Sequence, residues 1–132
     1  MRENVSPPFI PKTSVKLRRG DFAMLKREDG RYVPLVFLSS VPGKRVIFYG
    51  ALLAVLCEAA YIPEGQGMLN IAEAAMIDID AFSELDAPIL GNLSTHLSDP
   101  EIEEHLNEMR TRSLVWGRRT PLKYANNIAT AA

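Results

Sequence analysis

Two pairs of side chains have types and spacings that could support chemistry. Asp78 and Asp80 are two residues apart, and a pair of carboxylates can act as a general acid and a general base. However, no basic residue lies near them in the sequence to hold a substrate. His96 and His105 are nine residues apart, and neither has a cysteine or histidine companion at the spacing of a zinc site. Neither pair therefore predicts a catalytic or metal centre.

The chain also lacks the common catalytic motifs. It has no Gly-x-Ser-x-Gly nucleophile elbow, no phosphate-binding glycine-rich loop and no zinc-ligand spacing. The glycine–lysine pair Gly43-Lys44 is followed by Arg45 and lies in a predicted hairpin turn, so it is not a P-loop. We therefore expect a protein that is not an enzyme and that holds no metal or cofactor.

The net charge of −1 conceals a strong segregation of charge along the chain. Residues 1–45 hold ten lysines and arginines and four acidic residues. Residues 46–109 hold twelve acidic residues and no lysine or arginine, whereas residues 110–132 hold five lysines and arginines and no acid. Such segregation is typical of chains with charged partners, although the two signs could also meet in the fold and cancel.

The acidic segment predicts a surface that attracts a strongly basic protein by long-range electrostatic steering. A surface of this kind resembles a row of phosphates, as in a protein that blocks the positive cleft of a nuclease. Its carboxylates are those of Asp78, Asp80, Glu84, Asp86, Asp99, Glu101, Glu104 and Glu108. The apolar neighbours Ile79 and Phe82 are expected to add desolvated contact area.

The alternative is a small β-sheet module that binds nucleic acid. Basic residues decorate its predicted turns: Lys16, Arg18, Arg19, Lys26, Arg27, Arg31, Lys44 and Arg45. Four aromatic residues could offer stacking faces for bases, namely Tyr32, Phe37, Phe48 and Tyr49. Against this alternative, the pI is near 6.1, below the usual value for a nucleic-acid-binding domain.

The elements that must position these residues begin with a meander of three strands, at residues 21–26, 31–38 and 45–49. The Asp-Gly pair at residues 29–30 and the Pro-Gly pair at residues 42–43 are hairpin-turn signals. Residues 51–60 are apolar on all sides, which predicts a buried helix, with a continued strand as the competing interpretation. Alternation over residues 76–82 predicts a half-buried strand that exposes both aspartates.

A helix is predicted from residue 98 onward. Asp99 can cap it, Pro100 suits its first turn, and Ile102, Leu106 and Met109 form one apolar stripe. Residues 113–118 predict a last strand that closes the sheet, with Trp116 in the core.

These elements predict one α+β domain: a strongly bent antiparallel sheet or small SH3-like β-barrel with one or two packed helices. Residues 1–14 are expected to be an extended N-terminal arm, residues 15–124 the domain, and residues 125–132 a C-terminal tail. The first twelve residues have no apolar run after their charges, so we expect no signal peptide, and no apolar run in the sequence is long enough to cross a membrane. The single cysteine, Cys57, is expected to pack as a small apolar residue, and a cytoplasmic location fits best.

Five short segments resemble the immunity protein 26 family. They are GDFA at residues 20–23, DGRY at 29–32, VIFY at 46–49, LVWG at 114–117 and TPL at 120–122. The resemblance covers residues 16–50 and 113–122. It implies an intracellular antidote that binds and blocks a cognate toxin domain, of the kind found beside secreted polymorphic or contact-dependent toxins. No binding residue is carried over from the family.

Overall fold

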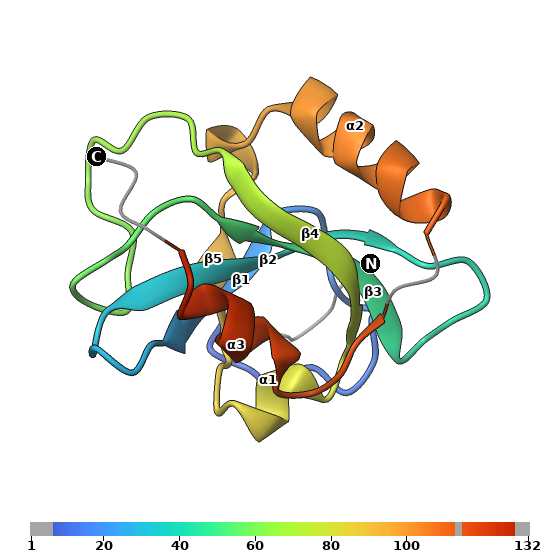
Figure 1. The fold of residues 1–132 in the computed structure, drawn as a ribbon, viewed down its shortest axis with the longest axis horizontal. Helices are drawn as coiled ribbons and strands as arrows, with labels where there is room; N and C mark the ends of the chain where they lie inside the picture. Colours follow the sequence, from blue (N-terminus) through green and yellow to red (C-terminus); the bar gives the residue numbers. More distant parts are fainter. Residues whose placement is uncertain (1–6, 113–114, 129–132) are drawn as a thin grey trace.

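The protein is described by a computed structural model that covers residues 7–112 and 115–128. A six-stranded mixed sheet has the order β5-β1-β2-β3-β4-β6 (Figure 1). The elements, in chain order, are β1 (Asp21–Lys26), β2 (Tyr32–Ser40), β3 (Ile47–Leu53), β4 (Ile71–Asp78), α1 (Ala81–Glu84), β5 (Ile89–Asn92), η1 (Ser94–His96), α2 (Asp99–Arg110), β6 (Val115–Trp116) and α3 (Thr120–Ala125). Among the described residues, no helix is long and apolar enough to cross a membrane.

Strands β1, β2 and β3 confirm the predicted three-stranded meander. Adjacent strands pair antiparallel, and the two turns contain Gly30 and Gly43 with φ of 87° and 76°. These φ values lie in the left-handed region, which glycine adopts without a steric penalty. The two turn signals in the sequence therefore mark the turns that the chain makes.

The predicted helix over residues 51–60 is wrong. Its first residues continue β3 to Leu53, and the remainder is loop. The apolar run has a different cause, because β3 lies in the middle of the sheet and is covered on both faces. Leu52 packs into one core while Ala51 and Leu53 pack into the other. A strand buried on both faces has no polar side and so loses the alternation that would identify it.

The predicted strand over residues 76–82 is displaced toward the N-terminus. Strand β4 spans Ile71–Asp78, and the chain then turns into the single-turn helix α1. Ile77 and Ile79 are fully buried, whereas Asp78 and Asp80 are half-buried. The alternation therefore identified the inward residues correctly but not the end of the strand.

Two hydrophobic cores lie on opposite faces of the sheet. Strand β2 shows the division: Leu35 and Phe37 belong to one core, and Val36 and Leu38 belong to the other. Helices α1 and α3 cover the first core, and α2 covers the second (Figure 1). The molecule is thus a three-layer arrangement, with the sheet between α2 and the pair of shorter helices.

Helix α2 is where the sequence placed it. Ile102, Leu106 and Met109 are buried as one stripe against the sheet. The N-cap is Ser98 rather than Asp99, because the Ser98 hydroxyl accepts a hydrogen bond from the Glu101 N–H at 3.4 Å. Asp99 lies in the first turn, where a carboxylate is favoured by the helix dipole.

The sheet stays open, so the expected closure into a barrel does not occur. Strand β6 has two residues and runs parallel to β4 at one edge, which makes the sheet mixed rather than antiparallel throughout. Residues 113 and 114 of the predicted last strand lie outside the described residues. Trp116 is in the core as expected, and its ring stacks on that of Tyr124 at 4.6 Å.

The described parts of the predicted arm and tail are attached to the domain. Phe9 forms a β-bridge with Ile89 at the β5 edge, and the Ser14 N–H donates to the Arg45 carbonyl at 2.8 Å. At the other end of the chain, Ala125 and Ile128 are buried in the core beneath α3. The packed domain therefore includes residues on both sides of the expected 15–124 boundaries.

Candidate protein-binding surface

The eight carboxylates that were expected to share one acidic surface do not form one continuous face. One group lies where β4 turns into α1, and it consists of Asp78, Asp80, Glu84 and Asp86. The other group lies along α2, and it consists of Asp99, Glu101, Glu104 and Glu108. Because α1 and α2 cover opposite faces of the sheet, the expected single acidic surface is divided into two (Figure 1).

Three of the four carboxylates at the β4–α1 corner form ion pairs or hydrogen bonds with other described groups of the protein. Asp80 pairs with Arg118 at 3.3 Å, and Glu84 pairs with Arg119 at 3.0 Å. One Asp78 oxygen accepts the Asp80 N–H at 2.9 Å, which closes a local turn. These contacts use the same two aspartates that could have formed a catalytic pair, and they indicate a structural role for both.

Ile79 and Phe82 cannot supply contact area to a partner. Both side chains have 0% exposure, and both belong to the core beneath α1 and α3. The expectation that they extend the acidic surface is therefore corrected. The alternation that turns Asp78 and Asp80 toward solvent is the same alternation that turns Ile79 inward.

The carboxylates on α2 differ in their availability. Arg19 binds both Asp99, at 3.4 Å, and Glu103, at 3.0 Å. Glu101 accepts a hydrogen bond from the Ile71 N–H at 3.3 Å, so it joins the helix to β4. Among the described residues, Glu104 and Glu108 on the outer side of α2 are bound neither by Arg19 nor by the backbone of β4.

Glu104 and Glu108 are both exposed on α2. Among the residues that the structure describes, Glu104 has no ion pair, and Glu108 reaches only Arg112, at 3.9 Å. An exposed ion pair of that length contributes little to stability, so replacing Arg112 with a cation of a partner protein would cost Glu108 little free energy. These two side chains are the acidic groups best placed to meet a basic partner.

The sequence prediction missed an exposed apolar feature in the β3–β4 loop, residues 54–70. Tyr61 and Met68 have exposed fractions of 64% and 59%, and the charged residues of the loop are Glu58 and Glu64. Long loops that carry no regular structure often bind partners. Pro63, Gly65 and Gly67 are the residues of this loop that indicate irregular structure in the sequence.

The loop is fixed at several points, so Tyr61 and Met68 are displayed by an anchored segment. The Ala54 N–H donates to the Asn70 carbonyl at 2.8 Å, and Cys57, which is buried, exchanges two backbone hydrogen bonds of 2.8 Å with Tyr32. At its far end the Leu69 N–H donates to the His96 carbonyl at 2.8 Å. This last contact brings the end of the loop beside η1, just before α2 begins.

The two histidines do not form a metal site with neighbouring ligands. His96 Nδ1 lies 3.3 Å from the Gly67 carbonyl oxygen, and His105 is half-buried on α2. Within residues 7–112 and 115–128, no group of three or more His, Cys, Asp or Glu side chains is arranged to hold a metal ion.

The aromatic faces proposed for stacking nucleic-acid bases are not available. Phe37, Phe48 and Tyr49 are buried, and Tyr32 is half-buried. Phe37 and Phe48 instead contact each other, with ring centroids 5.7 Å apart. Base stacking on the surface of this sheet would therefore require other residues.

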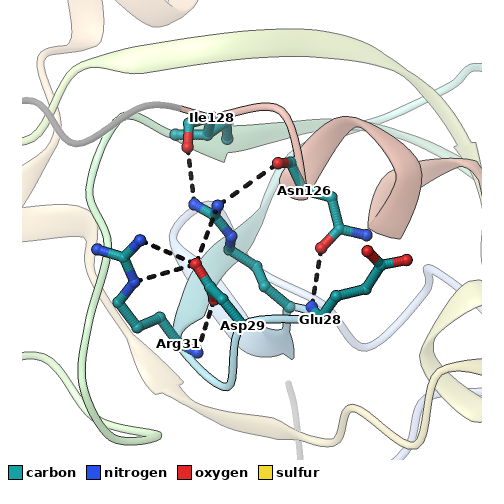
Figure 2. Close-up of polar contacts among 6 residues, drawn as sticks. Glu28, Asp29, Arg31, Asn126 and Ile128 are labelled. Carbon is teal, nitrogen blue, oxygen red and sulfur yellow. Dashed lines mark hydrogen bonds and ion pairs between the residues drawn. The ribbon is translucent and has the colours of Figure 1, made fainter.

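A polar cluster joins the β1–β2 turn to the chain segment after α3 (Figure 2). The Arg27 guanidinium donates to the Ile128 carbonyl at 2.7 Å and to the Asn126 carbonyl at 3.5 Å. It also pairs with Asp29 at 3.2 Å, and Asp29 in turn binds the Arg31 guanidinium at 2.8 Å. This clamp holds the end of the described chain against the hairpin, and all its partners belong to the protein itself.

Asp29 gives the clamp a dependence on pH. The backbone N–H of Arg31, its guanidinium, and the charge of Arg27 hold the pKa of Asp29 below the ordinary value of 3.8. A lowered pKa in the folded state stabilises the fold at pH values above 3.8, and this stabilisation is lost as the pH falls through the lowered pKa.

We therefore expect Asp29→Asn to lower the unfolding midpoint at pH 7 and to have a smaller effect at pH 3. Urea denaturation of both proteins at the two pH values measures this difference. Glu28→Gln, on the same turn, is the control and should show no such pH-dependent difference. Equal effects of Asp29→Asn at both pH values would contradict a stabilising ionised Asp29.

The chain matches no protein-family model, no curated protein and no solved structure.

Proposed function

We propose that the protein is a non-enzymatic inhibitor of the immunity-protein class, which binds a basic effector domain through the outer side of α2 and the adjoining β3–β4 loop. The proposal places it in the cytoplasm, where it would occlude the active cleft of a toxin, for example a nuclease. The observation that carries the proposal is the exposed, weakly paired carboxylate pair Glu104 and Glu108 on α2. The β3–β4 loop, which displays Tyr61 and Met68, meets the segment just before α2 through the hydrogen bond from the Leu69 N–H to the His96 carbonyl.

The composition of this surface supports a protein partner. Exposed tyrosine is frequent at the energetic centres of protein interfaces, and methionine adapts its shape to an apolar pocket. The loop and the outer side of α2 carry acidic residues, and the arginines nearby, Arg19 and Arg112, are the counter-ions already described. A partner with a basic rim around an apolar pocket therefore complements the surface.

The segments that resemble the immunity protein 26 family support the same class of function. Those segments lie mainly in β1, β2, β3, β6 and α3, whereas α2 and the β3–β4 loop lie outside them. We infer that the resembling parts form the scaffold and that the dissimilar parts select the partner. This division is expected of inhibitors that must each recognise a different toxin.

Charge reversal tests the role of α2. Glu104→Lys should slow association with a cognate basic effector domain by about tenfold at low salt, because steering depends on exposed charge. Glu28→Lys makes the same change on the distant β1–β2 turn and is the matched control. Stopped-flow association rates at several salt concentrations provide the measurement, and the difference should shrink as salt rises. Equal rates for both variants would reject α2 as the binding surface.

Truncation of Tyr61 tests the loop. Tyr61→Ala should weaken binding to the same effector domain by roughly 30-fold, as expected of an interface hot spot worth about 2 kcal/mol. The loss should appear mainly in the dissociation rate, since no charge is changed. Tyr61→Phe keeps the ring and should retain most of the affinity. If Tyr61→Ala binds like the wild type in surface plasmon resonance, the loop is not part of the interface.

A further inference from the structure

A second surface, of opposite charge, lies on the N-terminal segment. A hollow of about 320 Å³ is lined by Phe9, Ile10, Pro11, Lys12, Thr13 and Lys16. The segment is held in place at both ends, by the Phe9–Ile89 bridge and by the 2.8 Å hydrogen bond from Ser14 N–H to the Arg45 carbonyl. The hollow is thus part of the folded domain.

The cations around this hollow have no carboxylate partner among the described residues. Lys12 and Lys16 are exposed on its rim, and Lys44 and Arg45 are exposed on the β2–β3 turn that Ser14 contacts. In the part of the chain that the structure describes, none of these four side chains has an ion pair. Their behaviour differs from that of Arg19, Arg27, Arg118 and Arg119, each of which binds a carboxylate of the protein.

Apolar side chains are exposed in the same region. Ile10 on the wall of the hollow is 40% exposed. Val15 and Val46 follow Ser14 and Arg45, which share the hydrogen bond, and they are 60% and 53% exposed. Exposed apolar side chains that lie among unpaired cations mark a surface suited to a ligand with both apolar and anionic groups.

We propose that this cationic hollow binds an acidic segment of a partner protein, which inserts an apolar side chain beside Ile10 while its carboxylates meet Lys12 and Lys16. The volume of about 320 Å³ is concave space of a size that takes a side chain. Lys44 and Arg45, on the turn that Ser14 contacts, add further exposed positive charge to this region. This site is separate from the acidic surface of α2 and does not depend on the function proposed for it.

Two other anionic occupants fit less well. Single-stranded nucleic acid is bound largely by aromatic stacking, and the rings of Phe37, Phe48 and Tyr49 are buried while Tyr32 is half-buried. An anionic bilayer presents a broad surface that has no projecting group to fill a concave site, and the exposed residues here include no interfacial tryptophan. A peptide with carboxylates on either side of a leucine or phenylalanine satisfies both the charge and the shape.

Fluorescence anisotropy with the complete chain tests the proposal. The probe is a fluorescein-labelled peptide of alternating glutamates around one phenylalanine and one leucine, and its comparison is the same peptide with glutamine in place of glutamate. We expect saturable binding of the acidic peptide, at least about tenfold weaker binding of the glutamine peptide, and weaker binding of both as salt rises. Absence of binding by the acidic peptide would overturn the proposal.

Charge reversal locates the site. The double variant Lys12→Glu/Lys16→Glu should lose about tenfold or more in affinity for the acidic peptide. The double variant Lys26→Glu/Lys123→Glu makes the same change in charge elsewhere and should bind like the wild type. Lys12→Gln/Lys16→Gln should be intermediate, which keeps the test available if the reversed protein folds poorly. Equal losses in the two reversed proteins would overturn the assignment.

The same experiment tests nucleic acid and an anionic membrane as alternative occupants. A labelled thymidine oligonucleotide and vesicles of phosphatidylserine with phosphatidylcholine replace the peptide at equal charge concentration. Tighter binding of either than of the peptide, lost in Lys12→Glu/Lys16→Glu, would replace the proposed occupant. A second copy of the chain is the remaining possible occupant, and sedimentation of the protein alone tests for it. Self-association that Lys12→Glu/Lys16→Glu abolishes would show that a second copy fills the hollow, which would replace the proposed occupant.

Discussion

Replacing Phe82 with alanine is expected to lower the free energy of unfolding by about 3–5 kcal/mol. The Phe82 ring has 0% exposure and stacks on Phe48, with the centroids 5.4 Å apart and the planes inclined by 16°. Removing the ring deletes buried apolar area and leaves a cavity between α1 and the sheet, because Phe48 is itself held against Phe37 and cannot collapse into the space. Urea denaturation followed by circular dichroism measures the loss.

Ser83→Ala, on the exposed side of the same helix, is the matched control and should change stability little. The pair of variants separates the two roles that the sequence allows for Phe82. If Phe82 contributed only to a partner surface, Phe82→Ala would be as stable as Ser83→Ala, and the effect would appear in binding alone. A stability loss below about 1 kcal/mol would therefore contradict the buried position of the ring.

The segments that the sequence predicted correctly are those in which local signals and tertiary packing agree. In α2, the Ser98–Pro100 start and the stripe of Ile102, Leu106 and Met109 indicate the same helix that the sheet then covers. In the meander, Gly30 and Gly43 occupy the left-handed turns that the dipeptide signals favour. Neither inference needed knowledge of distant contacts.

The segments that the sequence predicted wrongly depend on contacts between distant residues. Residues 51–53 are apolar because β3 is covered by both helical layers, a condition that only the complete fold creates. A strand that is buried on both faces has the same apolar composition as a buried helix, so composition alone could not separate the two. Likewise, charge counting along residues 46–109 could not reveal that the sheet separates the carboxylates of α1 from those of α2.

The candidate site could be predicted only in part, because it too depends on contacts between residues that are distant in the sequence. The total acidic charge of the segment is a property of the sequence, but the availability of each carboxylate depends on which arginine reaches it. Arg118 and Arg119 follow β6 in the chain, and they reach Asp80 and Glu84 only because β6 pairs with β4. The exposure of Tyr61 depends likewise on the distant contacts that fix the β3–β4 loop, such as those of Cys57 with Tyr32 and of Leu69 with His96.

Replacing Arg27 with alanine is expected to lower the free energy of unfolding by about 3 kcal/mol. The Arg27 side chain is 11% exposed, and its guanidinium makes the contacts to the Ile128 carbonyl and to Asp29 that close the clamp (Figure 2). Hydrogen bonds to a charged group contribute roughly 1.5–3 kcal/mol each, and loss of the cation leaves those acceptors without their partner. Urea denaturation measures the change.

Arg31→Ala is the control because Arg31 binds the same carboxylate from a more exposed position, with 37% of its side chain accessible, and does not reach the end of α3. It should cost clearly less than Arg27→Ala. Arg27→Lys should be intermediate, since an ammonium group cannot reproduce the fork of guanidinium donors. Equal losses for Arg27→Ala and Arg31→Ala would mean that the bond to Asp29, and not the bond to the end of the chain, carries the stabilisation.

Hydrogen exchange then identifies which part of the fold Arg27 holds. The Ile128 N–H donates to the Ala125 carbonyl at 3.2 Å, and both side chains are buried in the core beneath α3. In Arg27→Ala the Ile128 amide should exchange faster than in the wild type, while the amides of α2 on the opposite face should change only by the global loss of stability. A selective loss at α3 follows from the clamp because Arg27 is the side chain that ties this segment to the β1–β2 turn through its backbone carbonyls.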